Sequence, residues 1–343
     1  MRIAVAGGGT GGHLYPALAI LEAMSKITEI EVMYFTLKRG IESSVLPQEH
    51  PEYERITIDI RGLERPLFKP TNLKRMLKIW RIESIILSEM SRFAPNAVLV
   101  TGGYVSIPVG RVALKLEIPL FVQEQNAVPG LANRILARSA RKVFVGFEET
   151  AKHFTSTAKR NVIVTGNPVR ESYSELREDF GDDYILVFGG SRGSDFINQL
   201  MEQLYEHDKK TKFVHGTGSK EWAERLSRFE NVRALEYIQN MKRAWEGAKA
   251  AVTRAGALTV SEMLYYGVPC VLIPWEGAAG SHQLFNALYA EKLGRAKVLR
   301  ERTANLESFK ACLMDVVALG KVVSVNRINP ALKIGKTILE ECK

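Results

Sequence analysis

The chain has 343 residues, a formal net charge of +9, 46% hydrophobic residues and three scattered cysteines. No apolar run reaches the roughly 18 residues of a membrane-spanning helix, the N-terminus reads as a strand and not as a signal peptide, and neither a disulfide framework nor a zinc site is indicated. We therefore expect two domains in a reducing cytoplasm, and the positive charge predicts an anionic partner such as a nucleic acid, a membrane surface or a phosphorylated substrate.

The N-terminal stretch predicts a strand, a glycine turn and a helix in succession. Residues 3–6 are apolar, residues 7–12 read GGGTGG, and a helix begins near His13. Glycines let the backbone approach an anion closely, and the start of a helix offers unpaired N–H groups and a partial positive charge. The stretch favours a phosphate site, with a purely structural glycine turn as the alternative.

The same stretch matches the dinucleotide fingerprint, because Gly7, Gly9 and Gly12 have its spacing. A dinucleotide enzyme would also place Asp or Glu after the second strand, predicted at residues 31–36, to hold the ribose. Lys38 and Arg39 stand there, with no carboxylate. The missing carboxylate therefore argues against a dinucleotide, but Lys38 and Arg39 could bind a 2′-phosphate, so NADP is not excluded as a ligand.

His13 is the first candidate catalytic residue. It lies where the glycine turn becomes a helix, so we expect its side chain at the carboxyl end of the first strand. A histidine there can act as a general base near neutral pH. Phosphate binding or a structural role are the alternatives.

The rest of the first half alternates strands and helices. A polar, proline-punctuated stretch covers residues 47–70, and a helix is predicted over 73–90. Strands are predicted at residues 97–100, 118–122, 142–145 and 161–164. A second glycine turn follows at 101–104, and polar side chains at 123–126 end another strand. This alternation predicts a mainly parallel sheet covered on both faces, with ligand at the carboxyl ends of its strands.

The helix over 73–90 lies in the most basic part of the chain. Between Arg61 and Arg92, eight basic and three acidic residues give a local charge of +5. No nucleic-acid motif accompanies it. An apolar stripe is flanked by cations, which suits an anionic membrane surface; an ordinary core face is the alternative. The stripe comprises Leu73, Met76, Leu77 and Trp80, and the flanking cations are Lys74, Arg75, Lys78 and Arg81.

The second half repeats the pattern after an inter-domain hinge at residues 165–170. Strands are predicted at 184–188, 212–215, 250–253 and 268–274, and helices at 195–205, 257–266 and 281–293. We expect an α/β protein with two doubly wound, Rossmann-like domains facing across a cleft. Residues 1–166 form the first, 167–327 form the second, and the helix at about 328–343 packs back on the first.

Six motifs occur in order along residues 1–287. They are GGTGGH at 8–13, GGYVS at 102–106, EQNA at 124–127, GNPVR at 166–170, GGS at 189–191 and GALTVSE at 256–262. In this ordered set the chain resembles the family 28 N-acetylglucosaminyltransferases of bacterial cell-wall (peptidoglycan) synthesis, which have the GT-B fold. The resemblance implies transfer of GlcNAc from UDP-GlcNAc, with inversion, to the C4 hydroxyl of MurNAc in undecaprenyl-diphosphate-MurNAc-pentapeptide (lipid I), which yields lipid II. It also implies a peripheral protein at the cytoplasmic face of the plasma membrane.

The resemblance further assigns donor residues. Thr10, Gly11 and Gly12 would lie near the sugar and diphosphate, Asn126 would contact GlcNAc, and the backbone of Ile238 would read uracil. Arg170 and Ser191 would lie by the diphosphate or nucleotide. The helix start formed by Ala257, Leu258, Thr259, Val260 and Ser261 would face the α-phosphate, and Glu262 would hold the ribose hydroxyls. Gln283, with His282 as a second choice, would contact the sugar, although residues 276–283 depart from the usual family pattern.

Catalysis and acceptor binding are assigned to the first domain. We assign Gly9, Gly103 and Tyr104 to the acceptor, His13 to the general base, and Glu124 as the second candidate base. Because no paired carboxylates or metal-ligand cluster stand out, we expect no obligatory metal. Three alternatives remain: another GT-B transferase with a different sugar or lipid, an NADP-dependent two-domain oxidoreductase, and a non-catalytic nucleotide-sugar sensor.

Overall fold

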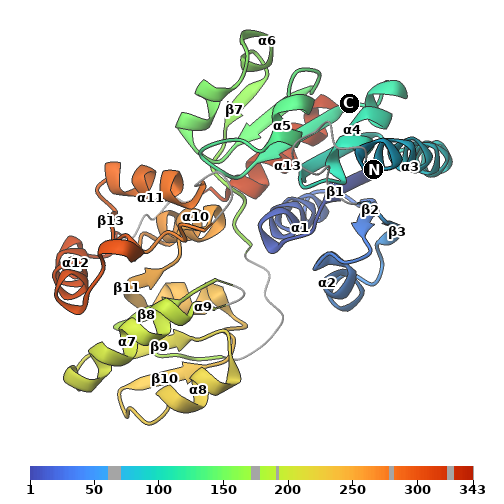
Figure 1. The fold of residues 1–343 in the computed structure, drawn as a ribbon. Coiled ribbons are helices and arrows are strands. Elements are labelled where there is room, and N and C mark those ends of the chain that lie inside the picture. Colours follow the sequence, from blue (N-terminus) through green and yellow to red (C-terminus); the bar gives the residue numbers. More distant parts are fainter. Residues whose placement is uncertain (61–70, 171–177, 191–192, 278–281, 323–327, 343) are drawn as a thin grey trace. The chain divides into compact units, whose positions relative to one another are not determined.

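The computed structural model describes the chain except for residues 61–70, 171–177, 191–192, 278–281, 323–327 and 343, and except for the side chains of residues 71–80. The chain divides into two compact units (Figure 1). The first comprises Met1–Arg170 together with Ile328–Lys343, and the second comprises Glu171–Arg327. Each unit is described by itself below.

The first unit contains a seven-stranded sheet in the order β3-β2-β1-β4-β5-β6-β7, and every neighbouring pair is parallel. The order reverses direction between β1 and β4, so the carboxyl ends of these two strands form a topological switch point, where such sheets bind ligands. The strands are β1 (Arg2–Gly7), β2 (Glu31–Leu37), β3 (Glu54–Ile58), β4 (Ala97–Gly102), β5 (Leu120–Glu124), β6 (Lys142–Val145) and β7 (Val162–Val164).

Helices cover both faces of this sheet because successive strand side chains point to opposite sides. Ile3 and Val5 of β1 pack with α1 (Gly11–Ser25), α2 (Glu42–Glu49) and α13 (Pro330–Glu341). Ala4 and Ala6 pack with α3 (Thr71–Phe93), α4 (Ser106–Lys115) and α5 (Leu131–Leu136). The short elements η1 (Glu148–His153) and α6 (Ser156–Lys159) join β6 to β7.

The second unit repeats the winding with a six-stranded parallel sheet in the order β10-β9-β8-β11-β12-β13. Its switch point lies between β8 and β11. The strands are β8 (Tyr184–Phe188), β9 (Phe213–Gly216), β10 (Val232–Leu235), β11 (Ala248–Thr253), β12 (Cys270–Leu272) and β13 (Ala296–Val298). The helices are α7 (Asp195–His207), α8 (Lys220–Leu226), α9 (Met241–Gly247), α10 (Ala257–Tyr266), α11 (His282–Lys292), η3 (Glu301–Thr303) and α12 (Leu306–Leu319).

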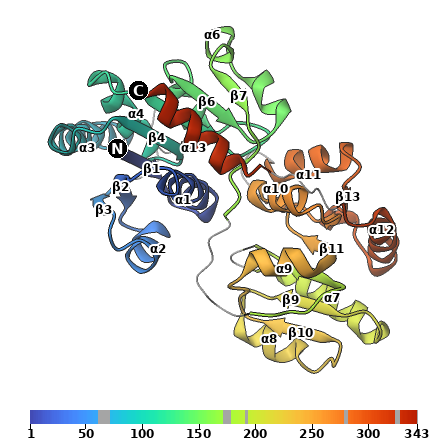
Figure 2. The same cartoon turned by 180° about the vertical axis from the view of Figure 1, so that it is seen from behind.

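The C-terminal helix α13 packs against α1 of the first unit (Figure 2). Ile334 and Ile338 are fully buried there, and Gly335 lies against Met24 with no room for a side chain. At the other end of the unit, Asn329 donates a hydrogen bond to the carbonyl of Val169 at 2.7 Å. The first long segment of this unit ends at Arg170, which is the last residue of the predicted hinge and lies four residues beyond the predicted boundary at Gly166.

Two doubly wound parallel sheets confirm the predicted α/β class. Some elements differ from the prediction. The stretch predicted as irregular at 47–70 includes the end of α2 and the whole of β3, because Pro47 is tolerated inside a short helix and β3 has only a partly buried face. Strands β10 and β13 and helix α12 were not predicted. No helix among the described residues is both long and apolar enough to cross a membrane.

Candidate functional site

The glycine loop of the first unit is held from beneath by buried polar groups. The Glu42 carboxylate accepts hydrogen bonds from the backbone N–H groups of Gly9 and Leu37, each at 2.8 Å. The Tyr34 hydroxyl donates to the carbonyl of Gly7 at 2.6 Å. A side chain at Gly8 would collide with the Glu42 carboxylate. The loop is therefore preorganised, and one of its N–H groups is already satisfied inside the unit.

Helix α1 begins directly after this loop with an open N-terminus. Thr10 occupies the N-cap position without a side-chain capping bond, and the first turn contains Gly11, Gly12 and no acidic residue. Such an end offers backbone N–H groups and a partial positive charge to a ligand. Thr10, Gly11 and Gly12 therefore stand at the open start of α1, shortly after β1, and their contact with the donor stays a prediction.

His13 lies in the first turn of α1 and is held by Thr101 at the end of β4. The imidazole Nδ1 is 3.0 Å from the Thr101 carbonyl, and the Thr101 hydroxyl donates to the His13 carbonyl at 2.6 Å. A carbonyl can only accept a hydrogen bond, so Nδ1 carries the proton. In the neutral imidazole this tautomer leaves the lone pair on Nε2, which is the form that a general base needs.

The second glycine turn lies against the first. Gly102 and Gly103 have φ angles of +115° and +83°. A Cβ atom at Gly102 would be 2.7 Å from the His13 ring, and one at Gly103 would be 2.7 Å from the Gly8 carbonyl. Tyr104, which follows, is 61% exposed. Gly103 therefore lies against Gly8, the residue before the proposed acceptor residue Gly9, and Tyr104 follows Gly103 in the chain.

The carboxylate of Glu124, the second candidate base, is fully hydrogen-bonded to the residues that follow it, between Asn126 and Asn133. Its carboxylate accepts four hydrogen bonds: two from Asn126, through the backbone and side-chain amides, one from the Gly130 N–H and one from the Asn133 amide. The residue is 1% exposed. An ionised carboxylate has about four lone-pair sites, so all are used. The structure thus gives Glu124 the role of organising residues 124–133 and of holding Asn126, and it favours His13 as the base.

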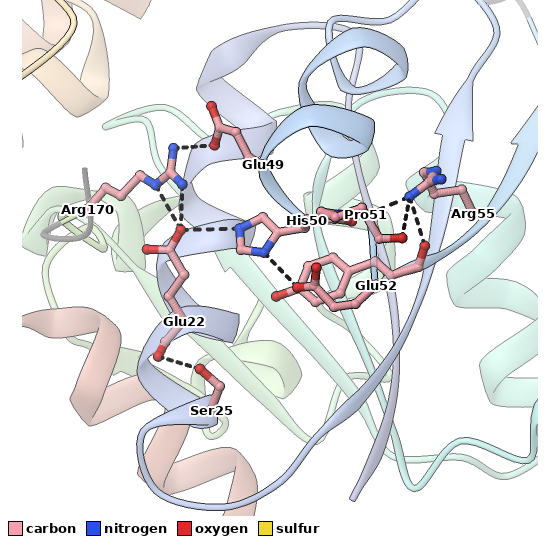
Figure 3. Close-up of polar contacts among 9 residues, drawn as sticks. Glu22, Ser25, Glu49, His50, Pro51, Glu52, Arg55 and Arg170 are labelled. Atoms are coloured by element: carbon pink, nitrogen blue, oxygen red, sulfur yellow. Dashed lines mark hydrogen bonds and ion pairs between the residues drawn. The ribbon is translucent and has the colours of Figure 1, made fainter. Parts of the chain in front are cut away.

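Arg170 does not lie at the switch point of the first unit. Its guanidinium binds the Glu22 carboxylate of α1 at 2.7 Å and the Glu49 carboxylate of α2 at 2.6 Å (Figure 3). Glu22 follows His13 by nine residues in α1, about 14 Å along the helix axis. The sequence analysis assigned Arg170 to the donor diphosphate. In this structure the guanidinium instead binds two carboxylates of its own unit.

His50 completes this cluster. Its Nε2 faces Glu22 at 3.4 Å, its Nδ1 faces Glu52 at 3.0 Å, and its ring stacks on Tyr53 (Figure 3). The hydrogen bond to Glu22 raises the pKa of His50, burial opposes this, and Glu52 adds to the rise. For Glu22, burial alone would raise the pKa of the carboxyl, but the contacts with His50 and Arg170 outweigh it and lower the pKa. The cluster fastens Arg170, the last residue before the chain enters the second unit, to α1 and α2.

In the second unit, two helices begin near the switch point, and only one of them has an open N-terminus. Helix α7 is capped by the Ser194 hydroxyl, and Asp195 lies in its first turn. Helix α10 follows Gly256 with no side-chain cap and no acidic residue in its first turn. An anion is therefore favoured at α10, where the sequence analysis placed the α-phosphate over residues 257–261.

Glu262 lies in the second turn of α10. Its carboxylate accepts a hydrogen bond from the indole Nε1 of Trp245 at 3.0 Å. Burial raises the pKa of this carboxyl to about 7, and the Trp245 bond opposes the rise. Near neutral pH the group can thus exchange a proton when a ligand arrives, which is typical of carboxyls at binding sites.

The other donor residues are partly placed. Ile238 is buried with its side chain against Gly216, and the Gln283 side chain accepts a hydrogen bond from the Trp275 N–H at 2.9 Å. The neighbouring His282 has a buried Nδ1 with no hydrogen-bond partner among the residues that the structure describes. Ser191 lies outside the described residues.

The proposed membrane residues are described only in their backbone. Leu73, Lys74, Arg75, Met76, Leu77, Lys78 and Trp80 fall within α3, and their side chains lie outside the described part of the structure. Within that part, no group of three or more His, Cys, Asp or Glu side chains could hold a metal ion.

Sequence reasoning missed the residues that support the site. Glu42, Tyr34 and Thr101 act through contacts between segments far apart in the chain. One signal was available for Glu42: a carboxylate follows the second strand after all, five positions beyond Leu37, where a helix begins. It binds the glycine loop of its own unit.

Two family models match the chain. The glycosyltransferase family 28 N-terminal domain matches residues 3–145, and the C-terminal domain of the same family matches residues 184–324. The relatives that match along the whole chain carry the name UDP-N-acetylglucosamine–N-acetylmuramyl-(pentapeptide) pyrophosphoryl-undecaprenol N-acetylglucosamine transferase. The protein of Pseudothermotoga lettingae is 55% identical over 100% of both chains, and that of Thermotoga maritima is 49% identical over 99% of both.

Solved structures agree with this match. The crystal structure of MurG from Acinetobacter baumannii is 26% identical, covers 99% of both chains and has a TM-score of 0.75. A UDP-GlcNAc 2-epimerase from Neisseria meningitidis, at 16% identity and a TM-score of 0.63, shares the fold. The chain belongs to glycosyltransferase family 28 and, within it, to the N-acetylglucosamine transferases that carry this name.

Proposed function

We propose that His13 is the general base of a direct transfer of GlcNAc from UDP-GlcNAc to the muramyl sugar of the undecaprenyl-diphosphate-linked pentapeptide. The chain is an N-acetylglucosaminyltransferase of family 28. The observation that carries the proposal is the tautomer of His13: Nδ1–H is bound to the Thr101 carbonyl at 3.0 Å, which leaves the Nε2 lone pair for the substrate. The relation to this family argues against the NADP-dependent oxidoreductase and sensor alternatives.

The transfer is a single displacement with inversion. His13 Nε2 removes the proton of the C4 hydroxyl, the hydroxyl oxygen bonds to the anomeric carbon, and the bond from that carbon to UDP breaks with its electron pair on the diphosphate. The departing charge needs stabilisation, and preorganised N–H donors supply several kcal/mol toward it. The open N-terminus of α10 supplies such donors.

The substrates are divided between the units. The ionised Glu262 carboxylate accepts hydrogen bonds from the two ribose hydroxyls of UDP, since one carboxylate can accept a pair of donors. The acceptor sugar lies at the switch point of the first unit, against Gly9, Gly103 and Tyr104. Because Glu42 already places a negative charge under this loop, a neutral sugar suits it better than a second diphosphate.

The lipid acceptor also requires a membrane surface. Helices α3, α4 and α5 adjoin in sequence order, and each carries exposed apolar side chains: Ile85 on α3, Leu114 on α4, and Leu131 and Ile135 on α5. Exposed basic residues accompany them, namely Arg81, Arg111, Lys115, Arg134 and Arg138. Together with the stripe at residues 73–80, they fit peripheral attachment to the cytoplasmic face of the plasma membrane.

The reaction is tested by UDP release from UDP-GlcNAc with and without a lipid-linked MurNAc-pentapeptide. We expect release that depends on this acceptor, a slower reaction with UDP-GalNAc, and unchanged turnover in EDTA. Equal release without acceptor, or none with it, would contradict the proposed reaction. Loss of turnover in EDTA would contradict only the metal-free mechanism.

The membrane surface is tested with vesicles of anionic phosphatidylglycerol. Replacing Leu131 and Ile135 with serine should weaken binding, whereas Met314→Ser, at a 73% exposed position on α12 of the second unit, should not. Replacing Lys74, Arg75 and Lys78 with glutamate should weaken binding to anionic vesicles further. Equal binding by all four proteins would rule out this surface.

A further inference from the structure

A chain of buried side-chain amides leads from the end of the first unit to His13. Gln123, Gln125 and Asn167 are each at most 1% exposed. None of them lies beside His13 in the sequence: Gln123 lies in β5, which pairs with β4, Gln125 directly follows β5, and Asn167 follows β7. Polar groups buried to this degree usually have hydrogen-bond partners. Here the side-chain amide nitrogens donate along one connected path, and the Gln125 side-chain oxygen has no partner among the described residues.

The direction of every bond in this path is set by two backbone carbonyls. At one end the Asn167 amide nitrogen donates to the Gln125 carbonyl at 2.8 Å, so the Asn167 side-chain oxygen accepts from the Gln123 nitrogen at 2.9 Å. The Gln123 side-chain oxygen then accepts from the Gln125 nitrogen at 2.5 Å. A carbonyl cannot donate, so no amide in this chain can be flipped without placing two acceptors together.

At the other end, the Gln125 nitrogen donates its second proton to the Thr101 carbonyl at 2.7 Å. This is the same carbonyl that binds Nδ1–H of His13. The following N–H, that of Gly102, is 3.1 Å from the Ser106 hydroxyl. The peptide group between Thr101 and Gly102 is therefore held on both sides, in a turn whose φ of +115° only glycine adopts readily.

We infer that Gln125 is a positioning residue for the reaction: it aims the Thr101 carbonyl that fixes the tautomer and orientation of His13, and Gln123 and Asn167 hold it in place. Partners that orient a histidine through its second nitrogen have this effect in catalytic and metal sites. Asn167 lies three positions before Arg170, where the chain leaves the first unit for the second. The inference rests on the proposed role of His13.

The test compares Gln125→Met, which keeps the size of the side chain and removes the donor, with the parent enzyme and with His13→Gln. We expect Gln125→Met to lower kcat by about 10- to 100-fold, a range below that of losing a general base, with the KM for UDP-GlcNAc within about twofold of the parent value. In the His13→Gln background the same change should have little effect, because residues that act through one another are not additive. Asn167→Leu should lower kcat less than Gln125→Met.

A spectroscopic readout separates positioning from folding. In enzyme labelled with 15N-histidine, the His13 signals, identified by their loss in His13→Gln, should show the Nδ1–H tautomer, and Gln125→Met should shift them toward a mixture. The control is Asn161→Ala, which removes an amide-to-carbonyl bond of 3.0 Å elsewhere in the same unit and should leave the His13 signals unchanged.

Two results would overturn the inference: an unchanged His13 tautomer in Gln125→Met, or an equal loss of kcat from Gln125→Met with and without His13. If His13→Gln retained the parent kcat, the proposed base would be wrong. The tautomer measurement would still decide whether Gln125 orients the histidine.

Discussion

The sheets of the two units are wound in the same way. They differ in the charged groups that lie at their switch points. In the first unit, the loops are underpinned by buried carboxylates that accept backbone N–H groups: Glu42 beneath the first glycine loop and Glu124 within residues 124–133. In the second unit, the N-terminus of α10 is left uncapped, with no acidic residue in its first turn. Helices α1 and α10 both begin with an open N-terminus. The difference is that buried carboxylates hold the loops of the first switch point and add negative charge there, whereas the start of α10 leaves its donors for an anionic ligand.

The same contrast extends to the buried histidines. His50 of the first unit lies between Glu22 and Glu52, which favour its charged form. His215 of the second unit is fully buried between the Tyr205 hydroxyl and the Asn198 side-chain oxygen, where burial lowers its pKa to about 3. Folding therefore favours the charged, doubly protonated form of His50 and disfavours that form of His215.

The largest expected effect is the loss of the carboxylate beneath the glycine loop. Glu42→Ala leaves the N–H groups of Gly9 and Leu37 without their partner. Losing the partner of a donor costs about 1–3 kcal/mol when the donor is buried. Both donors here are partly buried, so we expect the free energy of unfolding of the first unit to fall by at most about 2–6 kcal/mol. Hydrogen exchange should accelerate at residues 7–12. The surface variant Glu54→Ala, which loses an exposed ion pair with Arg92, should change stability by less than about 1 kcal/mol. Equal effects of the two variants would contradict the proposed role of Glu42.

Acid should destabilise the second unit through His215. Its pKa is lowered on folding, so the unfolded chain binds a proton that the folded unit rejects. Stability should therefore be constant above about pH 6.5 and fall as pH drops toward 3, by up to about 1.4 kcal/mol per pH unit. Urea unfolding, monitored by the fluorescence of Trp245, should show this slope. His215→Gln should reduce it, and an unaltered slope would assign the acid sensitivity to other groups.

Donor affinity should depend on the Glu262 proton. Because the carboxyl pKa is about 7 without ligand, and because the ionised form accepts the ribose hydroxyls, UDP binding should strengthen from pH 6 to pH 8. Glu262→Gln should weaken binding by about tenfold, the order of one to two kcal/mol for a charged hydrogen bond, and should remove this pH dependence. Calorimetry with UDP at three pH values measures both. A pH dependence that persisted in the variant would contradict the assignment.

The smallest effect concerns His50. Its pKa is raised on folding, so its contribution is fully present below about pH 6.5 and is lost as pH rises through the folded value. His50→Gln should lower stability at pH 5.5 by less than about 1 kcal/mol, since the site is partly exposed, and by less at pH 9. A larger loss at pH 9 than at pH 5.5 would contradict the pairing with Glu22.

Local pattern was sufficient for most of the fold. Apolar runs such as residues 3–6 and 184–188 mark central strands that are buried on both faces, and glycine turns mark their carboxyl ends. Strand β3 was missed because it is short and only Ile58 is fully buried: Arg55 and Thr57 are exposed, and Glu54 shares the inward face with the partly buried Ile56. The edge strands β10 and β13 have only four and three residues and carry little pattern of their own.

The site was predictable where chemistry and local geometry coincide. His13 and the start of α10 combine a reactive or dipolar group with a glycine turn, so their positions followed from neighbouring residues. The roles of Glu124 and Arg170 did not, because each depends on partners that the fold supplies: four amide donors for Glu124, and the Glu22 and Glu49 carboxylates for Arg170. A charged residue in a sequence motif therefore predicts where that residue lies in the fold more reliably than it predicts whether the residue binds substrate or stabilises the protein.

The central claim is that the first unit supplies the base through His13, and a single-turnover measurement tests it most directly. Enzyme in excess is mixed with UDP-GlcNAc and the lipid-linked acceptor, and the rate of UDP formation is compared for the parent and His13→Gln. The account predicts a fall of about 10²- to 10⁴-fold, with UDP binding unchanged within about twofold. A variant that formed UDP at close to the parent rate would contradict the claim and would return Glu124 to consideration.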